Sequence, residues 1–452
     1  MAVQFKQLDR KTPYLLPPSV QDYLPEDHLA CFVVEIVEQL DLSAFTDVYS
    51  GRGKKPYHPA MLVALLFYGY ATGVFSSRKL EKAAYDSIAV RYICANSYPD
   101  HDTIATFRKR FLKEIEGLFV DILLIAETMG LLKLGTVSLD GTKIKANASK
   151  HKALSWEYAN KLEEQLKAEV VELMQKAEEA DNATLPEEMN VPEELARREQ
   201  RLNTIAQAKK KIQARAKERF EREQAAYEEK VERRKCYEEE TGKKPRGRQP
   251  VAPSEGPLPK DQVNLTDEES RIMPTQGGFE QAYNAQAGVD IETYLIVEQH
   301  LSQSPNDKLE VSSTLENLDQ LPESLGAVRQ LLADTGYFSE ANTEKCESAG
   351  VEPLIPEKRH HHNLPLKERL AEDQEAPENP TAVAAMKHRL QTKAGREAYG
   401  QRKSTVETVF GIIKHVLGFR QFLLRGFDSV QSEWSLVCLA WNLKRIHALK
   451  VA

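Results

Sequence analysis

The sequence lacks the patterns that mark secreted proteins, membrane proteins and zinc–thiolate proteins. Its five cysteines are scattered over 452 residues, are odd in number, and include no Cys-x-x-Cys pair. This spacing argues against a disulfide framework and a thiolate metal site, and it favours a reducing cytoplasm. No apolar run approaches the length that spans a bilayer, and residues 1–14 contain no continuous apolar stretch. We therefore expect neither a membrane anchor nor a signal peptide.

An overall positive charge is also absent, although one segment is strongly basic. The formal net charge of −7 does not by itself indicate a nucleic-acid-binding protein. Between residues 386 and 425, however, nine Lys or Arg are set against two acids, Glu397 and Glu407, which leaves about +7. Charge alone does not separate a nucleic-acid contact from a solvated surface. At this length, with 41% hydrophobic and 29% charged residues, the chain can form two or three globular domains.

Residues 1–130 have helical periodicity. Asp27 begins an amphipathic stretch, Pro59 and Gly73 bracket an apolar helix, and Asp102 is the expected N-cap of one long helix after it. These helices fit a helix-turn-helix DNA reader and a plain helical domain with a basic rim equally well. The basic side chains expected on the surface are Arg78, Lys79, Lys82, Arg108, Lys109 and Arg110.

Two aspartates end apolar runs that predict strands. In TVSLD, small and apolar residues alternate up to Asp140, and Gly141 is expected to bend the chain into a second strand. In AVRQLLAD, a buried strand ends at Asp334. Residues 277–303 predict a hairpin between them, with its turn at residues 292–293. The order of elements is that of an α/β protein with a ribonuclease H-like mixed sheet, whose acids lie at strand ends.

The segment between these strands has a different pattern. Apolar residues, among them Leu154, Tyr158 and Leu162, recur every three or four positions in two runs, which predict an antiparallel coiled-coil hairpin broken near residues 180–192. Residues 241–260 are rich in Pro, Gly and basic residues and predict a flexible linker. The roles left open for this insertion are dimer contact, DNA clamping and a passive spacer. We divide the chain into a helical N-terminal domain (1–130), the first part of the catalytic core (131–150), the insertion (151–262) and the remainder of the core (263–452).

Glu407 is predicted to lie on a helix at the border between core and solvent. At about 100° per residue, the apolar residues from 399 to 417 share one face, and Lys403 and Lys414 lie along the same edge as Glu407. An i, i+4 salt bridge between Glu407 and Lys403 explains this position as well as metal binding does.

Two strand-borne aspartates and a helix-borne glutamate form a set of hard oxygen ligands. Such a set suits two Mg²⁺ ions acting on a phosphodiester, so the chain is most simply a nuclease or strand-transfer enzyme. Asp290 is a second candidate if the first-strand assignment fails, and Asp307 is expected to be a helix N-terminal charge. Three adjacent histidines at 360–362 have no Cys or His nearby to complete a zinc site, so a solvated loop is expected there.

The segment YGQRKSTVETVFGIIK resembles the C-terminal signature of the DDE transposases of bacterial insertion sequences. Tyr399, Arg402, Glu407 and Lys414 follow the family's order, with six residues between Glu407 and Lys414. Arg402 lies one residue too far upstream, whereas Lys403 is at the right distance from Glu407 but not from Tyr399, so either basic residue can fill the signature position. The strands VSLDGTKIKANAS and LLADTGYFSE, and the helical N-terminal residues, also look like their counterparts in this family.

The resemblance implies a catalytic and metal-binding triad of Asp140, Asp334 and Glu407. It implies metal-dependent cleavage at insertion-sequence ends and strand transfer, with Mg²⁺ as the cofactor and Mn²⁺ as a substitute. The implied partner is double-stranded DNA (terminal inverted repeats and target), bound by a homodimer in the bacterial cytoplasm, with no membrane association. The implied DNA contacts are Tyr399, Arg402, Lys403 and Lys414; the Tyr399 ring can either stack on a base or pack in the core.

Two other functions remain open at this point. A ribonuclease H-like nuclease would cleave without needing particular ends. A DNA-binding scaffold protein would bind DNA and leave it intact.

Overall fold

The structure, a computed structural model, describes residues 19–49, 55–180, 191–245, 247–275, 277–358, 375, 377–378 and 380–451. The chain divides into two units, each of which is described by itself. The first unit combines residues 1–146 with residues 282–452, and the second consists of residues 147–281. The helical N-terminal residues and the acidic strand ends thus belong to the same unit, whereas the domain boundaries drawn from the sequence stay a prediction.

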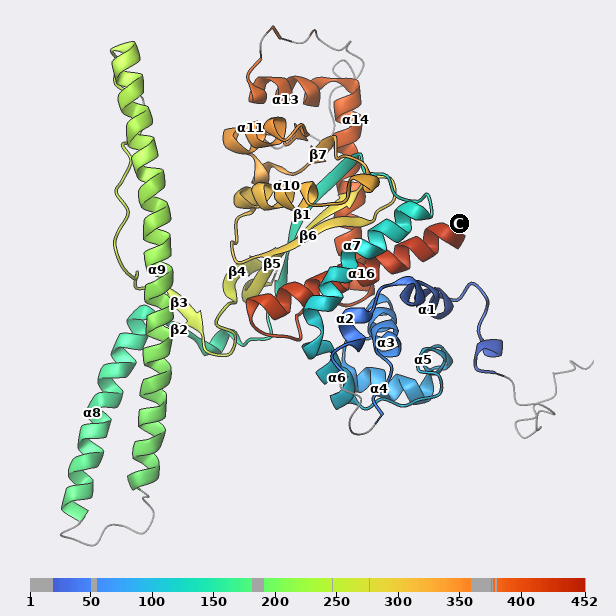
Figure 1. Cartoon of the computed structure of the whole chain (residues 1–452). Helices are drawn as coiled ribbons and strands as arrows, with labels where there is room; N and C mark the ends of the chain where they lie inside the picture. The colour runs from blue at the N-terminus through green and yellow to red at the C-terminus, as the bar shows by residue number, and fades with distance from the viewer. Residues whose placement is uncertain are drawn as a thin grey trace, which may run out of the picture. The chain divides into compact units, whose positions relative to one another are not determined.

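Short helices make up the N-terminal part of the first unit (Figure 1). Pro59 is the first residue of its helix and Gly73 follows the end with φ at +81°, as expected. The predicted Asp102 cap is wrong, because Asp100 accepts the hydrogen bond from the Thr103 N–H. The single long helix expected here is two helices that meet at Phe111. The elements are η1 (Gln21–Tyr23), α1 (Leu29–Gln39), α2 (Ser43–Thr46), α3 (Pro59–Ala71), α4 (Ser77–Asp86), α5 (Ile88–Ile93), α6 (His101–Arg110) and α7 (Leu112–Thr128).

A mixed sheet forms the centre of the first unit and confirms the predicted α/β, ribonuclease H-like arrangement. Its order is β4-β5-β1-β7-β8, and β6 also pairs with β5. β1 pairs antiparallel with β5, and β5 with β6, whereas β1, β7 and β8 are parallel. The strands are β1 (Thr136–Lys145), β4 (Arg271–Thr275), β5 (Gly278–Asp290), β6 (Ile296–Ser302), β7 (Gln330–Leu332) and β8 (Glu352–Leu354).

Gly141 does not bend the chain, contrary to the sequence prediction. β1 continues through it, with Asp140 opposite Ala287 and Gly141 opposite Gln286 on β5. A Cβ atom at position 141 would lie 2.2 Å from Nε2 of Gln286. Glycine is therefore required here because another side chain takes the space, and not because the backbone turns.

The last helix, α16 (Phe427–Val451), is the main core helix of the first unit. It packs against α3, α7 and β6, and Figure 1 shows α7 and α16 side by side. The Trp434 indole N–H donates to the Gln286 carbonyl at 3.0 Å, and the Asn442 amide bonds the backbone of Ile296. The remaining elements are η3 (Asp307–Leu309), α10 (Glu310–Asp319), η4 (Glu323–Leu325), η5 (Thr335–Tyr337), α11 (Glu340–Ser348), α13 (Ala382–Gln391), α14 (Lys393–Arg402), η6 (Lys403–Glu407), α15 (Thr408–Gly411) and η7 (Ile412–Val416).

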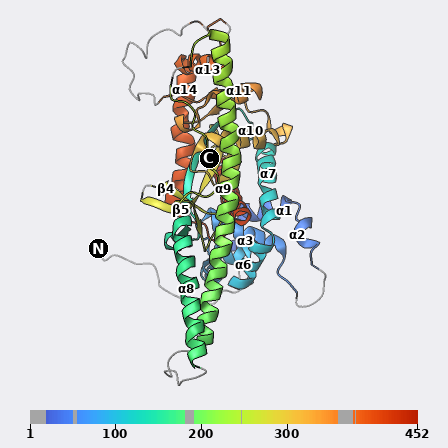
Figure 2. The same cartoon turned by 90° about the vertical axis from the view of Figure 1, so that its left-hand side faces the viewer.

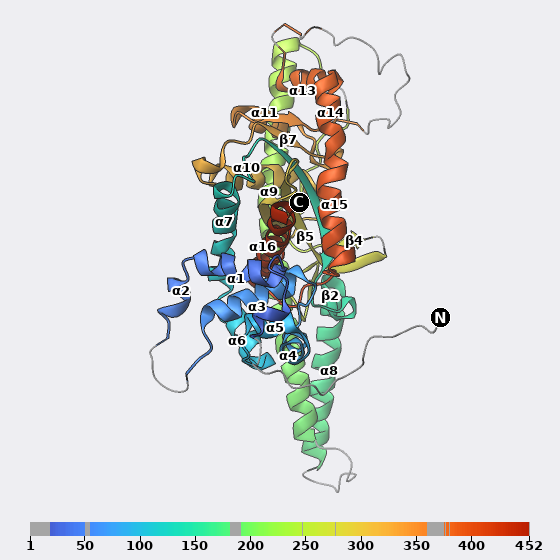
Figure 3. The same cartoon turned by 90° about the vertical axis from the view of Figure 1, so that its right-hand side faces the viewer.

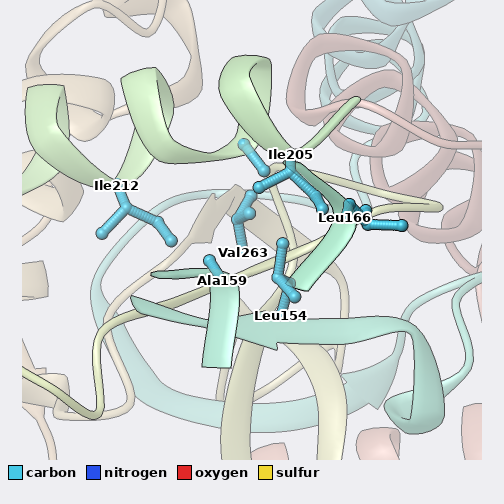
Figure 4. Close-up of a cluster of buried hydrophobic side chains, with 7 residues drawn as sticks. Leu154, Ala159, Leu166, Ile205, Ile212 and Val263 are labelled. Carbon is cyan, nitrogen blue, oxygen red and sulfur yellow. The ribbon is translucent and has the colours of Figure 1, made fainter. Parts of the chain in front are cut away.

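The second unit is a helical hairpin with a small sheet at its base. α8 (Trp156–Ala180) and α9 (Val191–Thr241) pack against each other, and β2 (Ala153–Ser155) pairs antiparallel with β3 (Gln262–Asn264), preceded by η2 (Lys150–Lys152). Figure 2 shows that α9 is much the longer helix. The two helices confirm the predicted hairpin; its turn lies outside the described residues. The buried seam, shown in Figure 4, contains Leu154, Ala159, Leu166, Ile205, Ala208, Ile212 and Val263.

Two details of this unit differ from the sequence prediction. Tyr158, expected in the seam, is 55% exposed, because the neighbouring Ala159 faces α9 instead. The segment expected to be a flexible linker is held against α9: Arg219 donates to the Gly256 carbonyl at 3.1 Å, and Arg234 to carbonyls between residues 245 and 248. Arginine side chains of the helix therefore fix a segment whose composition alone indicates a free chain.

All five cysteines are free, and all but Cys236 are buried. Within the described ranges, no helix has the length and hydropathy needed to cross a membrane.

Arg108 is buried, although the sequence predicts an exposed basic residue. It is 7% exposed and donates to the Tyr70 hydroxyl at 3.0 Å and to the Phe75 carbonyl at 3.1 Å. The Tyr70 hydroxyl in turn lies 3.1 Å from Oε1 of Glu433, a fully buried residue of α16. Burial raises the pKa of Glu433, and Arg108 opposes that rise. The positive charge of Arg108 thus compensates a carboxylate in the core.

We predict that Arg108→Met lowers the free energy of unfolding by about 3–5 kcal/mol, because it leaves the Glu433 charge buried without its cation. Urea denaturation measures this loss. Lys109→Met is the matched control, since Lys109 is exposed, and we expect a change within about 0.5 kcal/mol. Equal stabilities of the two variants would contradict the assigned network.

Candidate active site

Asp140 and Asp334 leave neighbouring parallel strands at the same level. The parallel register pairs Ser138 with Leu332, and each aspartate lies two residues beyond its member of that pair. Side chains two residues apart on a strand point to the same face. Asp140 lies within β1, whereas Asp334 follows β7 and caps the η5 turn, where its Oδ1 accepts the Gly336 N–H at 2.7 Å. The structure therefore places both carboxylates at one edge of the sheet.

The Asp140 carboxyl group is strongly affected by its surroundings. Burial raises its pKa to about 7, while Arg402 and the Gly141 N–H lower it and the negative charges of Asp334 and Glu407 raise it further. Its side chain keeps 20% exposure. The charges of the other two carboxylates therefore act on Asp140, and a positive charge beside it is favourable.

Glu407 is held by Arg402 across a widened helical turn. Figure 3 shows α14 and α15 running along β1, and η6 between them is a π-helix, with η7 a second one. Residues five apart point about 140° apart on an α-helix, but i→i+5 bonding brings them to one side. Arg402 Nη2 accordingly donates to Glu407 Oε1 at 2.9 Å, while Nη1 lies 3.4 Å from Asp140 Oδ2.

Glu407 pairs with Arg402, and not with Lys403, the salt-bridge partner considered from the sequence. The Arg402 side chain is 8% exposed and its Nε lacks a hydrogen-bond partner within the described part of the chain, whereas Lys403 is exposed. The regular α-helical projection could not find this pair, because the π-helical turns shift every residue after 402. The apolar face it placed in the core is correct: Val406, Val409, Phe410, Ile413 and Leu417 are buried.

Tyr399 and Lys414 both lie in this region, and neither is fully exposed. Burial raises the pKa of Tyr399, the hydrogen bond and charge of Arg402 lower it, and Asp334 and Asp140 raise it. The ring therefore lies beside the acidic group and not deep in the core. Lys414 donates to the Thr142 hydroxyl at 2.9 Å and to the Lys143 carbonyl at 3.2 Å, which fixes η7 to β1 two residues beyond Asp140.

A hydrogen-bonded network behind the site was not found from the sequence. Asp307 Oδ1 accepts from Lys143 at 3.1 Å, from Asn284 at 2.6 Å and from Gln286 at 2.9 Å. Gln286 Oε1 also accepts from the Tyr337 hydroxyl, at the end of the turn that Asp334 caps. These contacts join β1, β5 and the two turns. Asp307, expected to be only a helix N-terminal charge, is thus also the acceptor at the centre of this network. In the sequence, the glycine directly after Asp140 was the signal that another side chain comes close there.

The other sequence candidates are placed elsewhere. Asp290 caps the hairpin turn, accepting from the Thr293 N–H at 2.8 Å and from its hydroxyl at 2.7 Å, so it is a strand-end residue and not a ligand. The histidines at 360–362 lie outside the described residues.

The three carboxylates suit a divalent cation in chemistry but not in their present arrangement. They supply hard oxygen donors, and the pKa of Asp140 is raised by burial first and by the charges of Asp334 and Glu407 after it. Among the residues that the structure describes, however, no three His, Cys, Asp or Glu side chains are arranged to hold an ion together. The Arg402 guanidinium lies between Asp140 and Glu407 and supplies the positive charge there. An ion bound by this set must displace it.

Two family models match the chain. Residues 18–110 match "Transposase domain (DUF772)", and residues 251–443 match "Transposase DDE domain". Together they identify the chain as a DDE transposase of the insertion-sequence type. No match was found among curated proteins or among solved structures. The DDE match contains Asp334, Glu407 and the Tyr399–Lys414 segment, while Asp140 precedes it. In the sequence of the transposase, β1 with Asp140 thus precedes the helical insertion, and the matched DDE segment follows it.

We predict that Gly141→Ala destabilises the transposase by about 1–3 kcal/mol, because the added methyl group must push Gln286 away from Asp307 and Tyr337. An added Cβ would lie 2.9 Å from Asp307 Oδ1 as well. Chemical denaturation gives the difference in stability. Gly135→Ala, where a Cβ meets nothing within 4 Å, is the control and should be neutral. An unchanged stability of Gly141→Ala would show that the network does not fill this space.

Proposed function

We propose that this transposase cleaves DNA at the ends of an insertion sequence and joins those ends to target DNA, with Asp140, Asp334 and Glu407 as its metal ligands. The observation that supports this assignment best is the convergence of the three acids on Arg402: its guanidinium contacts Asp140 and Glu407, and Asp334 also acts on the pKa of both Arg402 and Asp140. Carboxylates of separate elements rarely share a half-buried place without a cation.

Divalent metal ions are general cofactors of the DDE transposase family, and Mg²⁺ is the ion we propose here, with Mn²⁺ as a substitute. When bound, such ions activate the attacking oxygen and neutralise charge on the phosphodiester. Asp140 is the carboxylate whose pKa both Asp334 and Glu407 affect, so we propose that it lies between them in the ligand set. Asp334 is held by its turn, whereas the Glu407 side chain is 47% exposed and forms its ion pair, within the described residues, with Arg402.

The basic residues of the site are proposed to hold the DNA strand. Arg402 is nearly buried and contacts Asp140 and Glu407, whereas Lys414 is partly buried and contacts β1 two residues beyond Asp140; both are suited to phosphate oxygens. Tyr399 lies next to Arg402 and is suited to stack on a base at the strand end. Lys403, one residue on and exposed, is suited to a phosphate farther from the acids. Double-stranded DNA, with terminal repeats and target, is the proposed partner, and two ends to be joined favour a homodimer in the bacterial cytoplasm.

We predict that Asp140→Asn, Asp334→Asn and Glu407→Gln each reduce cleavage about a thousandfold or more, since a bound ion stabilises the transition state by several kcal/mol. The assay is Mg²⁺-dependent nicking and joining of a supercoiled plasmid that carries the DNA flanking the gene. DNA binding, measured without metal by mobility shift, should survive in all three.

The matched controls are Glu397→Gln and Asp319→Asn, which remove exposed acids from α14 and α10 and should leave cleavage unchanged. Full activity in any of the three site variants would refute the ligand assignment. Cleavage that ignores the flanking DNA would favour a ribonuclease H-like nuclease, and binding without any cleavage would favour a scaffold protein.

Arg402 and the metal are expected to compete for the same carboxylates. We therefore predict that Arg402→Gln binds Mn²⁺ several-fold more tightly than the parent protein in the absence of DNA, measured by isothermal titration calorimetry. Its cleavage should nevertheless fall, because a phosphate contact is lost. Lys403→Gln removes the same charge one residue away and should leave Mn²⁺ affinity unchanged. Equal Mn²⁺ affinities of the two variants would contradict the competition.

A further inference from the structure

The segment after α9 forms a short loop whose backbone is turned toward the helix. We call residues 242–250 the basic loop. Arg234, two turns before the end of α9, donates to the carbonyls of Pro245 at 3.1 Å, Gly247 at 3.4 Å and Arg248 at 3.2 Å. Gly242 and Gly247 have φ values of +64° and +101°, which L-residues rarely adopt. The loop is therefore shaped by its glycines and held by one arginine of the helix.

The cations that the structure describes in the basic loop are Lys243, Lys244 and Arg248. All three are exposed, and no side-chain ion pair or hydrogen bond involves them within the described ranges. Several cations on the helices of the same unit are paired instead: Lys161 with Glu157, Lys167 with Glu163 and Arg197 with Glu193, each four residues apart. The loop thus presents cations without ion-pair partners among the described residues.

The basic loop and the residues around it, from Thr241 to Ser254, contain no acidic residue. Three acids, residues 238–240, precede the loop on the last turn of α9, yet none forms an ion pair with a loop cation in the described structure. Unpaired cations in a preformed loop raise the local potential and cost little entropy on binding a polyanion.

We propose that the basic loop binds the phosphate backbone of double-stranded DNA. This inference rests on the proposed function for the nature of the partner, and it gives the insertion a DNA-contacting role separate from the acidic site. DNA fits the loop because its phosphates are closely and regularly spaced, so that the cations of one short loop meet several charges at once. Lys and Arg side chains suit phosphate oxygens, so we expect the contact to be independent of DNA sequence.

The test uses the full-length protein with Lys243, Lys244 and Arg248 all changed to Gln. Duplex affinity is measured without metal at several salt concentrations, on flanking DNA and on unrelated DNA of equal length. Each neutralised phosphate contributes about −0.9 to the slope of log K against log salt. We expect the slope to become less steep by about 2–3, equally on both duplexes, with the melting temperature unchanged.

The control variant is Lys161→Gln with Lys167→Gln and Arg197→Gln, which has the same net charge but loses cations that are already paired on the helices. Its slope should change by less than about 1. The inference would be overturned if the slope of the loop variant were unchanged, or if it changed no more than the slope of the control variant. Either result would leave the cleavage proposal intact. Parent protein that shows no DNA binding would overturn both. A reduced slope with no cleavage by the parent protein would support the loop and contradict only the proposed function.

Discussion

The arrangement of the acidic site depends on one guanidinium group. Arg402 is nearly buried, contacts Asp140 and Glu407, and feels Asp334. Without a positive charge, three carboxylates could not share this place in their ionised forms, because burial already raises the pKa of Asp140 to about 7. The charge that holds the acids together thus comes from a residue of the chain's own signature segment.

The geometry of that arrangement is set from behind the sheet. Gln286 occupies the space left by Gly141 and bonds both Asp307 and Tyr337, which ties the turn of Asp334 to the strand of Asp140. The backbone carbonyl of Gln286 accepts a hydrogen bond from the Trp434 indole N–H, so α16 also contacts this network. A polar network of this kind fixes relative positions because each buried group would be costly to leave unpaired. The relative positions of Asp140 and Asp334 are therefore set in part by residues behind the sheet.

The insertion follows a different physical logic. Its hairpin is stabilised by a narrow apolar seam and by ion pairs along each helix. In the basic loop, Arg234 bonds the backbone, and the side chains of Lys243, Lys244 and Arg248 are exposed. A unit built this way can interrupt the catalytic strands without weakening their core, because its own seam supplies its stability.

The sequence by itself determined the mixed α/β fold, the strand that carries Asp140 and the strand that precedes Asp334, the helical hairpin and the family signature, because each depends on local periodicity or on residue order. It misjudged Arg108, Gly141, Tyr158 and the segment after α9, because burial and hydrogen bonding of these residues depend on partners distant in the chain, such as Glu433, Gln286 and Arg234. It also missed that Arg402, and not Lys403, bridges the acids, since a regular α-helical projection does not anticipate a π-helical turn. Only the tertiary structure decided these points, because each one is a contact between segments whose separation in sequence carries no periodic signal.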